Sequence, residues 1–167
     1  MSKAIRIYTR FCDVLEKILF WVIAAIVSVM IVIVALQILG RYVLSQPWLW
    51  TIDMAILCLV WSTLLASACG VRRNAHFVID LWPESWRGIS RILHIFTVVI
   101  ILVIGFYLLK EGWVYAEAGA RRMAGMTGIK MSYFLASIPT GAALMLIFIV
   151  EQMLNMFHAQ DKEASPS

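Results

Sequence analysis

Charged residues are scarce in this chain of 167 residues, where Asp, Glu, Lys and Arg together make up 14% of the sequence. None of them occurs in four stretches, residues 18–40, 54–71, 92–109 and 131–150. A helix needs roughly 20 apolar residues to cross the hydrocarbon core of a bilayer, and each stretch is about that long. Hydrophobic residues make up 62% of the chain, so little is left for a separate soluble domain. The sequence therefore predicts an all-α integral membrane protein with four transmembrane helices.

The sequence also lacks the motifs of common enzymes and metal proteins. It contains no P-loop, GxSxG or HExxH motif, and its three cysteines form no CxxC pair. Of its three histidines only His94 lies within an uncharged stretch, so no facing pair of histidines is available to hold a haem. The net charge of +4 comes from Lys and Arg residues that flank the apolar stretches, which indicates membrane topology rather than nucleic-acid binding. We expect no catalysis, no cofactor or metal in this chain, and no nucleic-acid partner.

We expect the four helices to cover residues 18–41, 48–71, 83–122 and 131–155. Pro83 suits the first turn of the third helix, and no proline follows before Ala124. At 1.5 Å per residue this long third helix would extend about 60 Å and project beyond the bilayer. Residues 1–17 have apolar residues at helical spacing, so they form either a short amphipathic helix that lies on the membrane and runs into the first crossing, as a cytoplasmic flank, or an ordinary basic flank. Pro139 is expected to bend the fourth helix, and residues 156–167 are expected to be a polar, disordered tail.

The distribution of Lys and Arg predicts which side of the membrane each end faces. Of the 14 Lys and Arg residues, most lie in the N-terminal flank, the second connection and the tail, and the remainder lie in the first and third connections. Because cytoplasmic loops carry the excess of basic residues, both termini are predicted to be cytoplasmic. Aromatic residues at the expected membrane interfaces agree, with Trp21 and Trp86 on the inner side and Trp48, Trp50 and Trp113 on the outer side.

Small residues recur along one face of the predicted third helix. Gly105, Gly112 and Gly119 are spaced seven residues apart, which is close to two helical turns. In a membrane such a stripe lets another helix approach closely. We therefore predict a helix-packing face here, directed either at another helix of this chain or at a partner subunit.

Asp53 is the acidic residue that lies clearly inside an apolar run, about one turn beyond Trp50. Acids within membrane helices are costly and often functional. Arg41, at the end of the preceding helix, is close enough in sequence to reach it, so our interpretation is a structural Arg41–Asp53 ion pair. A proton or sodium site at Asp53 is the alternative, although a single acid lacks the several oxygen ligands that a cation needs.

Other polar residues within the predicted helices are few, and the chain shows neither an internal repeat nor a pair of broken helices. A transport path usually requires such features. This pattern is typical of a scaffold for a larger transporter. At the inner end of the second helix, Arg72, Arg73, His76 and Asp80 are predicted to mark the cytoplasmic interface, with His76 and Asp80 close enough for a local hydrogen bond.

Several of these residues together resemble a known family. The pattern consists of Gly40-Arg41-Tyr42, Pro47, Trp50-Thr51, Asp53, Val71-Arg72-Arg73, His76 and Asp80. It resembles the small membrane subunit of tripartite ATP-independent periplasmic (TRAP) transporters, over about residues 15–155. The family usually has two adjacent acids after the tryptophan and Ser or Thr. Here Ile52 stands in the first of those positions and Asp53 in the second.

The resemblance implies a multi-pass protein of the bacterial inner membrane with a scaffolding and docking role. It implies a large membrane subunit that holds the substrate and sodium sites, and a soluble periplasmic protein that delivers an organic acid such as a C4-dicarboxylate or sialic acid. The alternative that the residues leave open is a free-standing, proton-driven, homo-oligomeric transporter that uses Asp53.

The ends of the helices on the outer side of the membrane are the expected docking region. We expect Arg41, Trp48, Arg121 and Arg122 to help bind an acidic surface of the periplasmic protein, since charged rims accelerate association. The alternative is that Arg121 and Arg122 only contact lipid phosphates or solvate the end of the helix.

Overall fold

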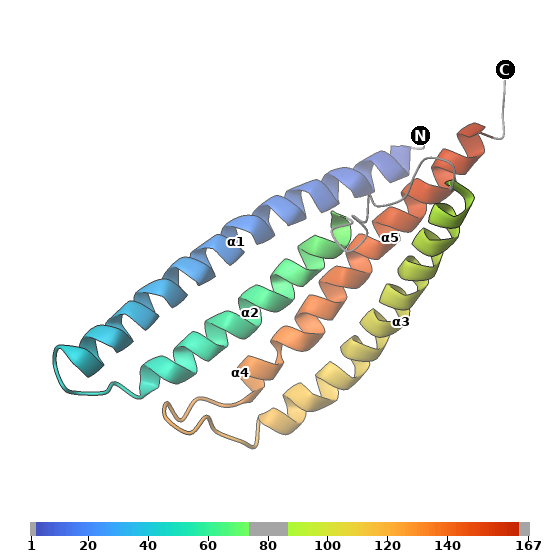
Figure 1. Cartoon of the computed structure of the whole chain (residues 1–167). Helices are drawn as coiled ribbons and strands as arrows, with labels where there is room; N and C mark the ends of the chain where they lie inside the picture. The colour runs from blue at the N-terminus through green and yellow to red at the C-terminus, as the bar shows by residue number, and fades with distance from the viewer. Residues whose placement is uncertain (1–2, 74–86, 164–167) are drawn as a thin grey trace.

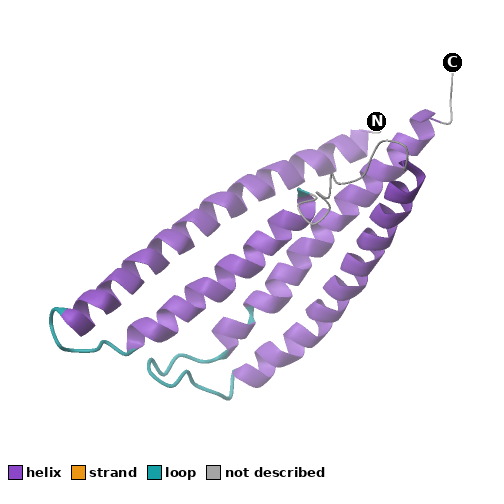
Figure 2. Cartoon of the chain, viewed as in Figure 1, coloured by secondary structure: helices purple, strands orange, loops and turns teal. Residues whose placement is uncertain are grey.

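A computed structural model of the chain describes residues 3–73 and 87–163 (Figure 1). The elements are α1 (Lys3–Tyr42), α2 (Trp50–Arg72), α3 (Arg87–Gly119), the single turn α4 (Ser132–Leu135) and α5 (Ser137–Glu163). Within those residues the structure is helix and loop, with one isolated bridge between Met123 and Lys130 (Figure 2).

Within the described residues, four segments are long and apolar enough to cross a membrane, which confirms the predicted all-α fold with four membrane helices. They are Ile5–Tyr42, Trp50–Arg72, Ile95–Gly119 and Ser132–Leu154. The last segment contains the break between α4 and α5. Pro139 explains this break, because proline has no N–H to donate to the carbonyl of Leu135 four residues earlier. The interruption falls at Ala136, three residues before the proline.

The helices largely follow the expected ranges, and two of their ends differ by more than two residues. α1 begins at Lys3, so residues 3–17 are helical and run directly into the first membrane helix, and no glycine or proline interrupts residues 3–39. α5 continues past residue 155 to Glu163, into the segment that was expected to be a disordered tail. α3 ends at Gly119, and the expected start of that helix at Pro83 lies outside the described residues.

The helices lie side by side in the order α1, α2, α5, α3 (Figure 1). Thus α2 packs between α1 and α5, and α5 packs between α2 and α3, while α1 and α3 do not meet within the described residues. Two small clusters hold this layer together. One cluster joins α1, α2 and α5 and consists of Cys12, Leu19, Leu65, Ala68 and Phe148. The other joins α2, α3 and α5 and consists of Val71, Val98 and Ile149.

The glycine stripe of α3 faces α4 and α5. A Cβ added at Gly105 would lie 3.1 Å from Leu146 Cδ2, and one added at Gly112 would lie 2.8 Å from Ile138 Cγ2. At Gly119 an added Cβ would lie 2.8 Å from Leu135 Cδ1. These separations are shorter than ordinary van der Waals contacts. At Gly112 and Gly119 backbone nitrogens also lie within 3.1 Å and 2.9 Å, so α4 and α5 approach α3 too closely there for a side chain, whereas at Gly105 the neighbour is the flexible end of Leu146.

Candidate functional site

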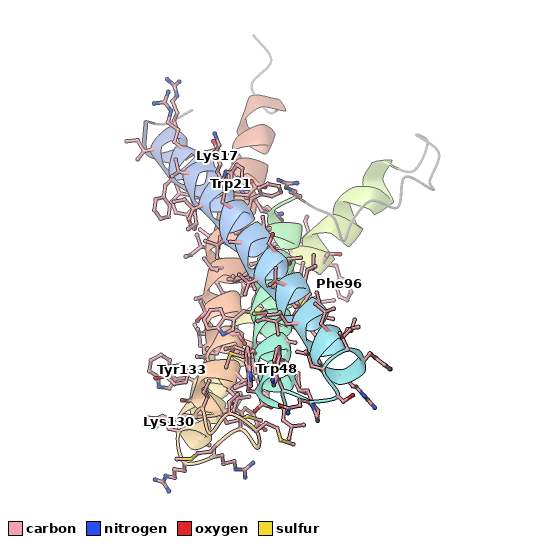
Figure 3. The ribbon with its side chains drawn as sticks, turned by 90° about the vertical axis from the view of Figure 1, so that its left-hand side faces the viewer. Lys17, Trp21, Trp48, Phe96, Lys130 and Tyr133 are labelled. Carbon is pink, nitrogen blue, oxygen red and sulfur yellow. The ribbon has the colours of Figure 1, made fainter. Side chains whose placement is uncertain are left out.

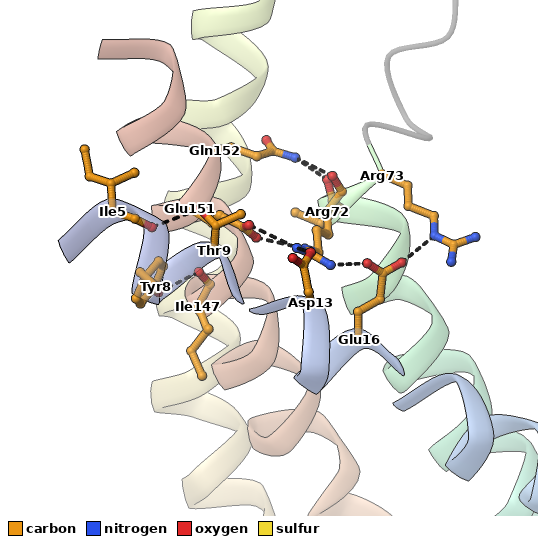
Figure 4. Close-up of polar contacts among 11 residues, drawn as sticks. Ile5, Tyr8, Thr9, Asp13, Glu16, Arg72, Arg73, Ile147, Glu151 and Gln152 are labelled. Atoms are coloured by element: carbon orange, nitrogen blue, oxygen red, sulfur yellow. Dashed lines mark hydrogen bonds and ion pairs between the residues drawn. The ribbon is translucent and has the colours of Figure 1, made fainter. Parts of the chain in front are cut away.

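Arg72, the last residue of α2, lies among three carboxylates (Figure 4). Its Nε donates to Glu151 Oε2 at 2.8 Å and its Nη2 donates to Glu151 Oε1 at 3.0 Å, which makes a bidentate pair. Nη2 also contacts Asp13 Oδ1 at 2.5 Å, and Nη1 donates to Glu16. Because Asp13 and Glu16 belong to α1 and Glu151 to α5, this single guanidinium links three helices.

This group, hereafter the Arg72 cluster (Asp13, Glu16, Arg72, Glu151), is largely enclosed. The side chains of Arg72 and Glu151 are 12% and 6% exposed, whereas that of Asp13 is 61% exposed. The neighbouring Arg73 donates from Nε to Glu16 Oε1 at 2.6 Å, but its side chain is 65% exposed. Removing charges from water is costly unless they are paired and hydrogen-bonded, and Arg72 and Glu151 meet that condition through their mutual contacts.

Backbone groups at the same end are satisfied from α5 and α1. Gln152 Nε2 donates to the carbonyl oxygens of Val71 and Arg72, which are among the last carbonyls of α2. Tyr8 OH donates to the carbonyl of Ile147 at 2.9 Å. The end of α2 is thus anchored on α5 through the backbone as well as through charge.

Only part of this arrangement was foreseen. Arg72 and Arg73 were predicted to mark this end, while His76 and Asp80 lie outside the described residues. The acids were missed, although Asp13 and Glu16 are three apart on one face of α1 and Glu151 directly follows an uncharged stretch. A lone acid at the end of an apolar run, opposite an arginine at the end of another, is the signal that could have indicated the pairing.

At the opposite end, Asp53 in the first turn of α2 binds the connection between α3 and α4. Its Oδ2 accepts hydrogen bonds from the backbone N–H of Met126 at 3.0 Å and of Thr127 at 2.9 Å, and from Thr127 Oγ1 at 2.9 Å. These donors differ from the predicted partner, Arg41. Within the described residues no ion pair joins Asp53 to Arg41. The Arg41 guanidinium instead lies 5.9 Å from the centre of the Tyr42 ring.

The connection bound by Asp53 has a defined shape of its own. The N–H of Ala124 donates to Ile129 O at 2.7 Å, and the N–H of Met131 donates to Arg122 O at 2.9 Å. Gly128 has a φ of +67°, which suits glycine at a tight reversal of the chain. We call residues 120–131 the outer turn. Next to it, Trp61 Nε1 of α2 donates to the carbonyl of Tyr133 in α4 at 2.9 Å, a second link between α2 and this region.

The four residues expected to dock a periplasmic protein lie at the same end as Asp53. Arg121 and Arg122 are exposed in the outer turn, and Arg41 is exposed at the end of α1. Trp48 lies beside Gly40, and its carbonyl accepts a hydrogen bond from Thr51 Oγ1 at 2.6 Å. Figure 3 shows Trp48, Lys130 and Tyr133 toward one end of the layer and Lys17 and Trp21 toward the other.

Several hydroxyl groups within the described part of the membrane helices bond to backbone carbonyls close by in sequence. Ser28 donates to Ala24 O, Ser62 to Leu59 O, and Thr63 to Leu59 O and Val60 O, and Ser137 and Thr140 likewise bond to carbonyls of the preceding turn. Among the described residues no group of three His, Cys, Asp or Glu side chains is placed to hold a metal ion. The donors of these hydroxyls are therefore used by nearby backbone carbonyls and do not line a polar path.

Comparison with known proteins places this arrangement in a family. Residues 30–159 match the family model described as the DctQ component of tripartite ATP-independent periplasmic transporters. The chain is 25% identical over 135 residues to the sialic acid TRAP transporter small permease protein SiaQ of Vibrio cholerae, covering 78% of this chain and 76% of that protein. It is 28% identical over 124 residues to the sialic acid TRAP transporter permease protein SiaT of Haemophilus influenzae, covering 71% of this chain and 20% of that protein. Because the family model matches most of the chain, this protein belongs to the DctQ family of TRAP transporter components.

Proposed function

We propose that this chain is the scaffold subunit of a TRAP transporter and that the substrate passes through a large membrane partner. The observation that supports this most directly is the local satisfaction of the helix hydroxyls, such as Ser28 and Thr140, by carbonyls of their own helices. A substrate path needs polar groups that are free to face a common cavity. A scaffold needs only helices held in a fixed arrangement.

The exposed apolar surface favours a membrane partner. Large hydrophobic side chains such as Ile31, Phe106 and Tyr107 are more than half exposed, on helices at opposite edges of the layer. Lipid or another membrane protein must cover this surface. The size of the Haemophilus relative, of which the matched segment is only 20%, favours a larger membrane protein working beside segments of this kind.

The substrate class that we propose is an organic acid, with sialic acid as the first candidate because the two relatives carry that name. In this proposal sodium binds to the large partner, and this chain has no catalytic role. The protein lies in the bacterial inner membrane with both termini in the cytoplasm. The Arg72 cluster is then at the cytoplasmic end and the outer turn is at the periplasmic end, where Arg121 and Arg122 face a periplasmic binding protein.

Co-purification tests the scaffold proposal. The chain is tagged, expressed with and without the large membrane subunit, and each preparation is reconstituted in liposomes with the periplasmic binding protein. We expect a stable complex, and uptake of sialic acid only when all three proteins are present. Proton-linked uptake by this chain alone, abolished by Asp53→Asn, would instead establish the free-standing transporter.

Charge reversal tests the docking part. Arg121→Glu with Arg122→Glu is expected to leave the membrane complex intact but to weaken uptake when the binding protein is limiting. Excess binding protein should restore much of the rate, because the charges act on association. If uptake is unchanged at every concentration of binding protein, these arginines have no docking role.

A further inference from the structure

We infer that Asp53 is a positioning residue, whose carboxylate holds the outer turn in the arrangement that presents its basic side chains to the periplasmic binding protein. The inference rests on the proposed docking function and adds a residue that does not itself touch the partner. It replaces both roles considered for Asp53 from the sequence, the ion pair with Arg41 and the cation site.

Apart from Ala124, which is 8% exposed, the tip of the outer turn has little packing of its own. Met123 and Met126 are 72% and 54% exposed, and a Cβ added at Gly125 or Gly128 would meet no atom within 4 Å. Internal hydrogen bonds shape the turn, but they do not fix its direction relative to the membrane helices. That direction depends on links to α2, and Asp53 makes the link at the tip.

The chemistry of this link is suited to a carboxylate. Two successive backbone N–H groups and one hydroxyl converge on Asp53 Oδ2 at 2.9–3.0 Å. Hydrogen bonds to an ionised acceptor are roughly twice as strong as neutral ones. The position of Asp53 in the first turn of α2 also places a negative charge where the helix dipole favours it. A cation at Oδ2 would have to displace donors that already point at this oxygen.

Holding the tip sets where the basic residues lie. Arg121 and Arg122 precede the reversal and Lys130 follows it, and all three are exposed. The bridge between Met123 and Lys130 and the bond from Met131 N–H to Arg122 O keep the two sides together. Once Met126 and Thr127 are bound to α2, the three charges lie on one rigid unit, and Lys130 points away from the helices (Figure 3).

The effect of losing the Asp53 hydrogen bonds can be expressed as the fraction of time that the outer turn spends in the docking arrangement. If the released turn occupies the docking arrangement about one tenth of the time, the apparent Kd for the binding protein rises about tenfold. Assembly with the large subunit is not expected to change, because the change is confined to one end of the chain. This separation between docking and assembly is what the experiment measures.

The experiment uses the complex of both membrane subunits in nanodiscs. Hydrogen exchange of the peptide covering residues 123–131 and the Kd for the transporter's own binding protein are measured for the parent, Asp53→Ala and Thr127→Val. Thr127→Ser, which keeps the hydroxyl, is the matched control. We expect faster exchange and a Kd raised roughly tenfold in Asp53→Ala, a smaller rise in Thr127→Val, and parental values in Thr127→Ser.

A combination variant separates positioning from a direct contact. When Asp53→Ala is combined with Arg121→Glu and Arg122→Glu, the reversal should weaken binding less than it does in the parent, because the charges are already misplaced. The inference is wrong if hydrogen exchange in Asp53→Ala equals that of the parent. It is also wrong if the Kd of Asp53→Ala equals that of the parent while the arginine reversal alone raises the Kd. If the reversal alone has no effect, the docking function itself fails. If Asp53→Ala does not assemble, the hydrogen exchange and Kd of Thr127→Val are compared with those of Thr127→Ser. Equal values in the two variants then overturn the inference.

Discussion

The Arg72 cluster permits a sharp test of what holds the membrane helices in place. Arg72→Met places an apolar side chain of similar length at this position and removes every hydrogen bond that Arg72 donates to the three carboxylates. Glu151, whose side chain is only 6% exposed, then loses both bonds of its bidentate pair. Glu16 keeps Arg73, and Asp13 stays largely hydrated. The free energy of the variant is therefore set mainly by one uncompensated carboxylate on α5.

The expected cost is large for a single substitution. Removing one partner of a buried ion pair destabilises a protein by about 3–5 kcal/mol. The adjacent Arg73 supplies a matched control, because it also pairs with Glu16 but its side chain is 65% exposed. Exposed pairs contribute about 0–1 kcal/mol, so Arg73→Met should change stability little. Arg72→Met combined with Glu151→Leu should recover most of the loss, since replacing both members of a buried pair is often neutral.

The assay is unfolding in mixed detergent and SDS micelles, followed by tryptophan fluorescence. The parent, Arg72→Met, Glu151→Leu and the double variant form a cycle whose coupling term measures the Arg72–Glu151 interaction. If Arg72→Met costs no more than Arg73→Met, the cluster is not what locks α1, α2 and α5 together. If the double variant is as unstable as the sum of the single ones, uncompensated charge is not the cause of the loss.

Three further predictions follow from packing and hydrogen bonding. Gly112→Leu should cost about 1–3 kcal/mol and reduce recovery of the complex, because its Cβ alone would approach Ile138 Cγ2 to 2.8 Å, whereas Gly125→Ala, in open space, should unfold like the parent. Trp61→Phe should lower the free energy of unfolding by about 1 kcal/mol in the same assay, because it removes the hydrogen bond to Tyr133. An unchanged free energy of unfolding would mean that this bond does not contribute to stability. Thr63→Val with Thr140→Val should leave the uptake rate near the parental value, and a tenfold loss would indicate a polar path through these helices.

The fold class was accessible from the sequence because it depends on a one-dimensional property. Uncharged stretches of about 20 residues specify membrane helices whatever their neighbours are. The spacing of Gly105, Gly112 and Gly119 likewise singled out one face of α3, since helical periodicity is local. It left open which helix the stripe meets, because the order α1, α2, α5, α3 depends on contacts distant in sequence.

The polar contacts were harder to predict for the same reason. Arg41 is the basic residue nearest to Asp53 along the chain on its N-terminal side, so proximity in sequence suggested that pair. The actual donors belong to Met126 and Thr127, more than 70 positions away, and two of the three are backbone N–H groups. Side-chain identity alone does not reveal that a turn will direct its amides at a carboxylate.

The two sites thus act on different parts of the same layer. The Arg72 cluster joins α1, α2 and α5 at one end, where the other links are apolar contacts and the hydrogen bonds donated by Gln152 and Tyr8. In a bilayer apolar contacts stabilise weakly, because lipid is as apolar as the side chains it replaces. Asp53 acts at the other end, where the chain leaves the membrane and the outer turn has little packing to hold it. Both constraints involve α2, so a change in the tilt of this helix would be transmitted to the outer turn as well as to the Arg72 cluster. For that reason Arg72→Met, which loosens one end of α2, should also raise hydrogen exchange of residues 123–131 if α2 moves as a rigid body, and leave it unchanged if the helix bends.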